Sequence, residues 1–261
     1  MKLESASAAA ELLDRSRRAG EVIDALPDDL RPRTRAEGYQ IQQQLEGFSS
    51  EPVFGWKIAA TSAAGQAHIG IDGPIAGRVF AESVYQDGEA IPFGANRMAV
   101  AEAEFAFKIG RDLEPRELPY EMVEVLEAVS DLHLAIETPD SRFEDFVTVG
   151  GPQLIADNAC AYNFVLGPKA PEVWRELDLA ALETIVRVTG LPDAPGKGAN
   201  VLGDPRIALV WLVNELSSLG ITLKAEQIVT TGTTTVPVPI KSGDTVVGDF
   251  GILGQVSCSF I

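Results

Sequence analysis

The segment at residues 100–109 holds two carboxylates at a spacing that could bind a cation. It reads Val-Ala-Glu-Ala-Glu-Phe-Ala-Phe-Lys-Ile, and strand alternation places Glu102 and Glu104 on one face and the apolar side chains on the other. The two carboxylates then lie about 6.5 Å apart along the strand. Because adjacent like charges destabilise each other unless a cation lies between them, the pair indicates a binding site. The alternative is an ordinary solvated strand face.

Two further ionisable residues lie in or beside apolar runs. Glu137 ends the stretch 132–136, and an acid at the end of a buried strand needs a partner, which could be a metal or Arg142. Lys57 lies within the apolar and glycine-containing run 53–60. A lysine there is either half-buried with a shifted pKa, which suits proton transfer, or a solvent-facing lysine at a sheet edge.

A threonine-rich segment at residues 230–235, Thr-Thr-Gly-Thr-Thr-Thr, could hold a carboxylate. Gly232 permits close backbone approach, and the neighbouring hydroxyl and N–H groups are donors. The alternative is ordinary β structure, in which threonine-rich strands are also common.

The chain has only two histidines, His68 and His133, and two cysteines, Cys160 and Cys258. These are too few and too scattered for a zinc knuckle or a disulfide framework. Any metal must therefore bind mainly to carboxylates, which predicts a hard cation, Mg²⁺ or Mn²⁺.

Composition excludes several classes of partner. The formal net charge is -17 and no basic block occurs, so nucleic acid and anionic membranes are not expected partners. No run approaches the ~20 apolar residues of a membrane-spanning helix, and the first 18 residues lack a signal-peptide pattern. These features predict a cytoplasmic protein.

The candidate residues must be positioned by the secondary structure, which the sequence predicts to be helical at the N-terminus and mainly β-strand after it. Periodicity predicts helices over 6–46, interrupted at 30–34, and short apolar runs at 55–60, 76–80, 99–109 and 229–240 predict strands. Further helices are expected at 119–130 and at 205–219, the latter with Ile207, Val210, Trp211, Asn214 and Leu216 on one face. We therefore expect an α+β protein with a helical N-terminal extension over 1–50 and a catalytic β-rich domain over 51–261.

The order of several motifs resembles the hydratase/decarboxylase branch of the fumarylacetoacetate hydrolase superfamily. The likeness spans nearly the whole chain, and several mid-length motifs in one order are more specific than any single one. The matching segments are Gly55-Trp-Lys-Ile-Ala-Ala-Thr-Ser62, the Glu102 and Glu104 strand, Glu137-Thr-Pro-Asp-Ser-Arg142, Ala156-Asp-Asn-Ala-Cys160 and Pro237-Val-Pro-Ile-Lys-Ser-Gly-Asp244.

This resemblance implies a mixed β-roll or barrel-like core and specific roles for residues. Metal ligands would be Glu102, Glu104 and Glu137, and the substrate would be a small 2-oxo or 2-hydroxydienoic acid, bound without an organic cofactor. Lys57, Asp157 and Cys160 would be catalytic, while Ile58, Thr231, Gly232 and Thr233 would bind substrate. The resemblance also implies a homo-oligomer.

The expected reaction is addition of water to a 2-hydroxy-2,4-dienoate, giving a 4-hydroxy-2-oxo acid in aromatic-compound degradation. Decarboxylation of a 4-oxalocrotonate-like acid is the alternative. Hydrolysis of an acylpyruvate C–C bond is a third reaction, and a catalytically silent scaffold or small-molecule sensor is the non-enzymatic possibility.

The sequence departs from the family pattern at four places. Ala59-Ala60 stands where glycine usually begins the pair and Cys160 stands for a serine, which predicts a pocket whose shape and proton network differ from those of a typical hydratase. Pro74-Ile-Ala-Gly77 is closer to the decarboxylases than to the hydratases and leaves both reactions open. Asp204 stands where a histidine is frequent, so it is not assigned a catalytic role.

Overall fold

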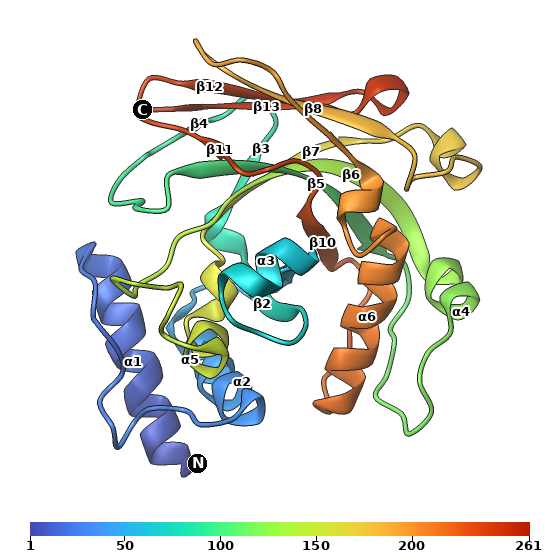
Figure 1. The fold of residues 1–261 in the computed structure, drawn as a ribbon. Coiled ribbons are helices and arrows are strands. Elements are labelled where there is room, and N and C mark those ends of the chain that lie inside the picture. Colours follow the sequence, from blue (N-terminus) through green and yellow to red (C-terminus); the bar gives the residue numbers. More distant parts are fainter.

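The computed structural model describes all residues from 1 to 261, and its strands form two sheets (Figure 1). The larger sheet has the order β2-β1-β10-β5-β6-β7-β3, with β11 paired to β5, and the smaller sheet has the order β4-β13-β12-β8-β9. The larger sheet contains β1 (Val53–Ala59), β2 (Ile75–Phe80), β3 (Val84–Gln86), β5 (Val100–Ile109), β6 (Val129–Thr138), β7 (Asn163–Lys169), β10 (Ile228–Thr233) and β11 (Val238–Pro239). The smaller one contains β4 (Ala90–Ile91), β8 (Glu183–Val188), β9 (Ala194–Lys197), β12 (Thr245–Asp249) and β13 (Gln255–Phe260).

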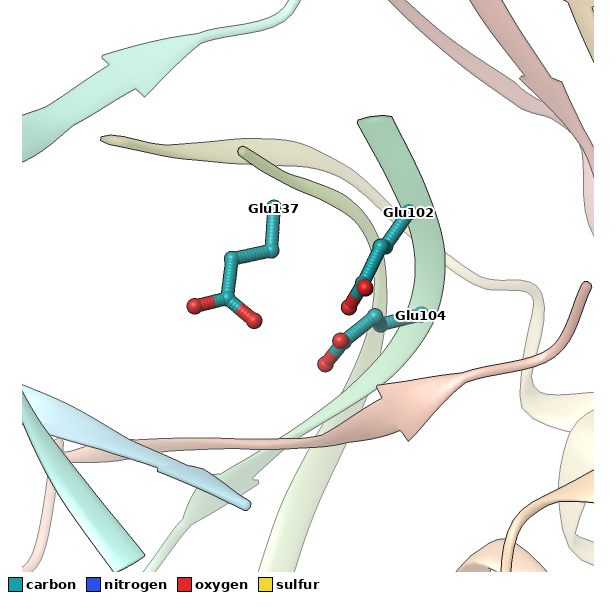
Figure 2. Close-up of side chains that lie close together, drawn as sticks. All are labelled: Glu102, Glu104 and Glu137. Carbon is teal, nitrogen blue, oxygen red and sulfur yellow. The ribbon is translucent and has the colours of Figure 1, made fainter. Parts of the chain in front are cut away.

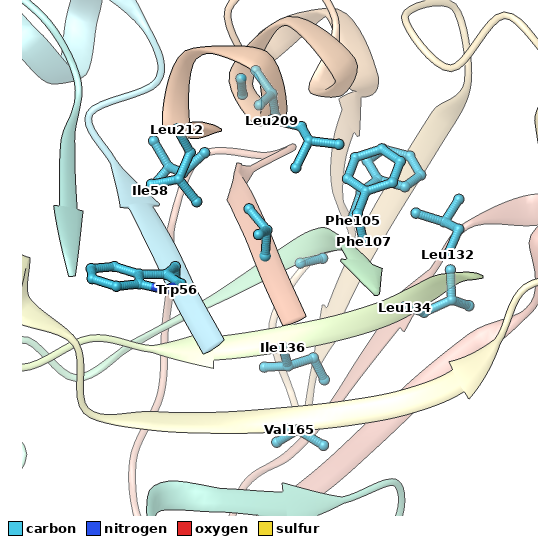
Figure 3. Packing of buried hydrophobic residues seen from close by; sticks show 14 of the residues in the cluster. Trp56, Ile58, Phe105, Phe107, Leu132, Leu134, Ile136, Val165, Leu209 and Leu212 are labelled. Carbon is cyan, nitrogen blue, oxygen red and sulfur yellow. The ribbon is translucent and has the colours of Figure 1, made fainter. Parts of the chain in front are cut away.

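One face of the larger sheet forms the main hydrophobic core. Alternation along β5 directs Ala103, Phe105 and Phe107 to this face, where all three are fully buried. The smaller sheet covers them, as the edge-to-face contact of Phe105 with Phe250 at 5.1 Å between ring centroids indicates. Figure 3 shows this cluster continuing from the strands to Leu209 and Leu212.

The opposite face of the larger sheet curls into a barrel-like interior. Val79 of β2 and Phe164 of β7 belong to one buried cluster with Ala106, Ala135 and Ile228, although β2 and β7 are separated by four strands in the sheet order. Such a cluster requires the sheet to bend around it. The predicted α+β architecture with a barrel-like core is confirmed by this arrangement and by the family match reported below.

The N-terminal helices pack against the β-rich part of the chain. Helix α1 (Leu3–Ala19) ends at Gly20, whose φ of 67° is the left-handed cap conformation. Helix α2 (Arg35–Gln44) begins after Thr34, whose side chain accepts a hydrogen bond from the Glu37 N–H. The interruption between them is therefore longer than the expected 30–34.

The two helices share a small core with α5 (Gly151–Ala156). Ala9, Leu13 and Ile41 lie in this core with Phe143 and Ala156, and Figure 1 shows α1, α2 and α5 gathered on one side. A domain boundary at residue 50 stays a prediction.

Two helix predictions need correction. Helix α4 covers only Met122–Glu127, because Val129 pairs with Ile109 and so joins β6 instead of continuing the helix. Helix α6 (Pro205–Ser218) has the expected length, but its buried face is not the expected one. Ile207 is 46% exposed, and the buried stripe consists of Ala208, Leu209, Leu212, Val213 and Leu216.

Helix α6 is apolar around most of its circumference, so spacing alone did not distinguish the buried stripe. Asp204 caps this helix, because its Oδ1 accepts a hydrogen bond from the Arg206 N–H at 2.8 Å. This capping role explains an aspartate at position 204 without any part in catalysis. The remaining helix, α3 (Ala63–His68), follows β1. No helix in the chain combines the length and apolar character needed to cross a membrane.

Candidate metal centre and active site

Three glutamates from two neighbouring strands converge inside the curved sheet (Figure 2). Glu102 on β5 lies opposite Glu137 on β6 in the antiparallel register, and Glu104 follows two residues along β5 on the same face. One carboxylate oxygen from each lies within 4.8 Å of the others. Glu104 and Glu137 are buried, and Glu102 is partly exposed. The alternative that Glu102 and Glu104 lie on an ordinary solvated strand face is therefore excluded.

Burial and mutual repulsion make this cluster electrostatically costly without a cation. Burial is the largest cause that raises the pKa of Glu102, to about 7, and the Glu137 charge adds to it. The pKa of Glu104 is raised well above its usual range for the same reasons, and burial also raises that of Glu137.

Two oxygens of this cluster lack any hydrogen-bond partner. They are Glu104 Oε1 and Glu137 Oε2, and both are buried. A buried acceptor without a partner costs about 1–3 kcal/mol, and more if charged. Three carboxylates with free oxygens are the donor set that a hard dication prefers, so the residues fit Mg²⁺ or Mn²⁺.

Lys57 on β1 is 3% exposed and lies beside the glutamates. Its Nζ is 3.0 Å from Glu137 Oε1 and donates to the Ala159 carbonyl at 3.0 Å. Burial by itself lowers the pKa of Lys57, but the charges of Glu137 and Glu102 outweigh burial and raise it. The solvent-facing alternative for Lys57 is therefore wrong, and the side chain is fully buried where the other alternative expected it to be half-buried.

The partner of Glu137 is thus Lys57 and not Arg142. The guanidinium of Arg142 instead contacts the carboxylate of Asp140. The sequence analysis considered a metal or Arg142 as the partner of Glu137. It did not predict Lys57, which comes from β1, a strand three places away from β6 in the sheet.

The threonine-rich segment fixes the orientation of Glu104. The hydroxyl of Thr230 and the Gly232 N–H, at 2.8 Å, both donate to Glu104 Oε2. Gly232 has a φ of 102°, and a Cβ there would lie 2.1 Å from Thr61 Oγ1. This position therefore requires glycine. Thr231 is buried, donates its hydroxyl to the Phe105 carbonyl at 3.0 Å and does not line the cavity described below, so its predicted role in substrate binding stays a prediction.

The centre opens into a cavity of about 930 Å³. The strands contribute Lys57, Ile58, Glu102, Gly232 and Thr233 to its wall. Helix α3 and the segments 59–62, 199–203 and 235–237 complete the wall, with Gln66, His68, Asn200 and Val236 among their residues. Four of the residues predicted for catalysis or substrate binding therefore share one cavity with a predicted metal ligand, and α3 was not predicted as part of the site.

Asp157 and Cys160 lie outside this wall. Asp157 Oδ2 accepts from Ser141 Oγ and from the Arg142 N–H, both at 2.7 Å, and Arg17 is 3.2 Å from Oδ1. Cys160 is buried, and burial with the nearby Asp157 charge raises the pKa of its thiol to about 12. Their catalytic roles stay predictions without support from the cavity.

A strained turn at 158–160 was not predicted and touches the lysine. Asn158, Ala159 and Cys160 have φ values of 57°, 51° and 62°, which is the left-handed region that residues with a Cβ rarely adopt. The Asn158 side chain bonds both the N–H and the carbonyl of Arg78, at 2.7 and 2.8 Å. Held in this way, the turn directs the Ala159 carbonyl at Lys57 Nζ. The Asp-Asn-Ala motif in the sequence was the only available signal for it.

Comparison with known proteins assigns a family to this fold and site. The model of the fumarylacetoacetate (FAA) hydrolase C-terminal domain matches residues 64–260. A 2-keto-4-pentenoate hydratase of Burkholderia vietnamiensis is 33% identical over 98% of this chain and 97% of its own length. A 2-oxo-hept-4-ene-1,7-dioate hydratase of Escherichia coli is 30% identical, covering 97% of this chain and 96% of its own.

Among solved structures, 4-oxalocrotonate decarboxylase from Pseudomonas putida G7, complexed with magnesium and adipate, has a TM-score of 0.90. It is 27% identical and covers 100% of this chain and 99% of that chain. The chain belongs to the fumarylacetoacetate hydrolase family, and the resemblance stated from its motifs is confirmed.

Proposed function

We propose that the chain is a metal-dependent hydro-lyase that adds water to a 2-hydroxy-2,4-dienoate and gives a 4-hydroxy-2-oxo acid. The observation that carries the proposal is the position of Lys57, 3.0 Å from a glutamate of the carboxylate triad and on the wall of an open cavity. Full-length similarity to a 2-keto-4-pentenoate hydratase supports the choice of reaction.

The triad would hold Mg²⁺ or Mn²⁺ through Glu102, Glu104 and Glu137. When bound, such a cation supplies a Lewis acid for the ketone and carboxylate oxygens of a 2-oxo acid and stabilises enolate charge. Gly232 and Thr230 keep Glu104 in place through their hydrogen bonds.

Lys57 would move the protons of the reaction. Its surroundings favour the ammonium form, so Nζ can donate a proton to the terminal carbon of the dienoate during ketonisation, while the 2-hydroxyl loses its proton to solvent. The amine then formed can take a proton from the water that adds at C4 and return one to C3, and a proton from solvent restores the ammonium. The Ala159 carbonyl keeps Nζ directed toward the triad.

The replacement Lys57→Met tests this role. We expect metal binding to be retained, because the ligands remain, and turnover to fall by about 10²–10⁴-fold, as for loss of a general acid or base. Lys108→Met is a matched control, since Lys108 lies on β5 and pairs with Glu226 at 2.7 Å outside the cavity. Turnover of Lys57→Met within about threefold of the parent would remove Lys57 from the mechanism.

Decarboxylation of a vinylogous 2-oxo acid is the second candidate function. It is favoured by the TM-score of 0.90 with 4-oxalocrotonate decarboxylase and by Pro74-Ile-Ala-Gly77 in β2 and before it. Both reactions use the same enolate. Following CO₂ release and 4-hydroxy-2-oxo acid formation with both substrate types separates them, and CO₂ release alone would replace the hydratase proposal.

Hydrolysis of an acylpyruvate has less support because no histidine pairs with a glutamate. His133 Nδ1 contacts the Gly167 carbonyl at 3.1 Å, and His68 packs edge-on against Phe146. We further propose that the enzyme is cytoplasmic and homo-oligomeric, and that it acts on a small-molecule substrate in the degradation of aromatic compounds.

A further inference from the structure

The N-terminal helix α1 contacts the strained turn that holds Lys57. Arg17 lies in the last turn of this helix. Its guanidinium donates to the Ala161 carbonyl at 3.0 Å and lies 3.2 Å from Asp157 Oδ1. Asp157 and Ala161 are the residues on either side of the turn at 158–160. Because a guanidinium presents its donors in a rigid fork, Arg17 holds both ends of the turn at once.

The turn needs support because its backbone conformation is unfavourable. Its three residues all have positive φ although each carries a Cβ, and such residues persist only where surrounding contacts hold them. The Asn158 side chain holds the inner side of the turn through the main chain of Arg78. Arg17 supplies the contacts on the outer side, at the two flanking residues.

Both acceptors of Arg17 are buried, so they depend on this side chain. Asp157 is 1% exposed and Ala161 is 7% exposed. Arg17 is the only cationic side chain that forms an ion pair with Asp157. Burial raises the pKa of Asp157, and the Arg17 charge is the largest influence that opposes it. Loss of Arg17 would leave a buried carboxylate and a buried carbonyl without these partners, which favours a rearrangement of the turn.

Helix α1 does not depend on Arg17 for its packing. Its buried face consists of small and apolar side chains, namely Ala6, Ala9, Ala10 and Leu13 with Ser16. The next residue, Arg18, bonds Asp14 at 2.7 Å and the Phe48 carbonyl at 2.8 Å, and makes no hydrogen bond to the turn. Arg18 is therefore a matched control for Arg17, with the same residue type in the same helical turn.

We propose that Arg17 is a positioning residue for the reaction. By holding Asp157 and Ala161, it keeps the Ala159 carbonyl directed at Lys57 Nζ, and so keeps the lysine beside the triad. This inference rests on the proposed function, because it takes Lys57 to move the protons. It makes the N-terminal helix necessary for turnover, although no residue of α1 lines the cavity.

The replacement Arg17→Met tests the inference. We expect kcat to fall by about 10–100-fold, as for a catalytic group displaced by about 1 Å. KM and Mg²⁺ affinity should stay within about twofold of the parent, because the triad and the cavity wall are unchanged. Arg18→Met should keep the parent's kcat. Steady-state kinetics on 2-hydroxypenta-2,4-dienoate, or on the vinylogous 2-oxo acid if the parent only releases CO₂, and calorimetry with Mg²⁺ measure these quantities below all melting temperatures.

A parental kcat in Arg17→Met would overturn the inference, and so would an equal loss in Arg18→Met. If Arg17→Met does not fold, Arg17→Lys takes its place. It keeps a positive charge near Asp157 but lacks the fork, so we expect kcat to fall at least about threefold at unchanged KM. A parental kcat in Arg17→Lys would then overturn the inference.

A double variant shows whether Arg17 acts through Lys57. In the Lys57→Met background, Arg17→Met should change the residual rate by less than about twofold, because the group that it positions is already absent. General loosening of the site would instead lower the rate by the same factor in both backgrounds, and that result would contradict a positioning role.

The single variants also distinguish the two proposals. If Lys57→Met alone keeps the parent's turnover, the proposed role of Lys57 is wrong and the inference about Arg17 fails with it. If Lys57→Met loses turnover while Arg17→Met keeps it, only the inference about Arg17 fails.

Discussion

The two faces of β5 serve opposite purposes within ten residues. Ala103, Phe105 and Phe107 pack into the main core, whereas Glu102 and Glu104 lie on the other face, where burial and the charge of Glu137 raise the pKa of both. The strand is therefore stabilised on one side and left electrostatically unsatisfied on the other. Because stability depends on the core-facing residues of β5 and metal binding on the alternate glutamates, a substitution on one face should leave the property of the other face nearly unchanged.

Glu104→Gln should show the largest effect on activity. It removes one charge from a site that has to balance a dication, so we expect Mg²⁺ affinity to drop and turnover to fall by at least about 10³-fold, since the Lewis acid supplies several kcal/mol of stabilisation. The fold should survive, because a buried, repelled carboxylate is lost. Calorimetry with Mg²⁺ and a thermal melt measure both, with Glu183→Gln, exposed on β8, as the control.

Unchanged Mg²⁺ affinity in Glu104→Gln would refute its assignment as a ligand. A melting temperature far below the parent's would instead show that the two faces are not independent.

Phe105→Ala should have the converse effect. The ring is fully buried and contacts Phe250, so its loss should cost about 3–5 kcal/mol of unfolding free energy. At a temperature where the variant remains folded, its metal affinity should stay close to that of the parent. Phe105→Leu, which keeps most of the volume, should lose less, and urea denaturation compares the three proteins.

The stability of the metal-free protein should depend on pH in an unusual direction. The pKa of Glu102 is raised to about 7 in the folded protein, above the usual value of 4.5, so the folded state binds the proton more tightly than the unfolded state. Stability is then greatest at acidic pH and declines as pH rises from about 4.5 through about 7. Melting temperatures of chelator-treated protein from pH 5 to 8 test this.

Added Mg²⁺ should flatten or reverse this decline, because a cation stabilises the ionised triad. A metal-free melting temperature that rises over the same interval would indicate that the triad does not control the dependence.

Cys160→Ser should have the smallest effect. The thiol is buried and lies off the cavity wall, so we expect stability to change by no more than ~1 kcal/mol and the substrate ranking to stay the same. The ratio of kcat/KM for two substrates of different tail length measures this. A shifted ratio would restore Cys160 to the substrate pocket, as its motif suggested.

The sequence predicted those parts of the site that lie within single strands. The alternation of residues 100–109 correctly separated the glutamates from the core, and the motif order correctly identified the family. Periodicity succeeded here because β5 is long and one of its faces is wholly apolar.

Features that depend on distant pairing could not be predicted in this way. The contact of Lys57 with Glu137 requires the curl of the sheet, and the end of α4 is decided by the pairing of Val129 with Ile109. Spacing also gave no reason to expect the turn at 158–160, since nothing in Asn-Ala-Cys by itself favours three successive left-handed residues.

That turn also constrains how the protein can evolve. Gly77 on β2 lies so close that a Cβ would be 2.2 Å from the Asn158 carbonyl oxygen, and the neighbouring Arg78 main chain is bound by the Asn158 side chain. A side chain at 77 would displace the turn and, through the Ala159 carbonyl, the lysine. Substitutions at residues 77 and 158 should therefore be coupled, so that homologues of this protein either keep both residues or change both.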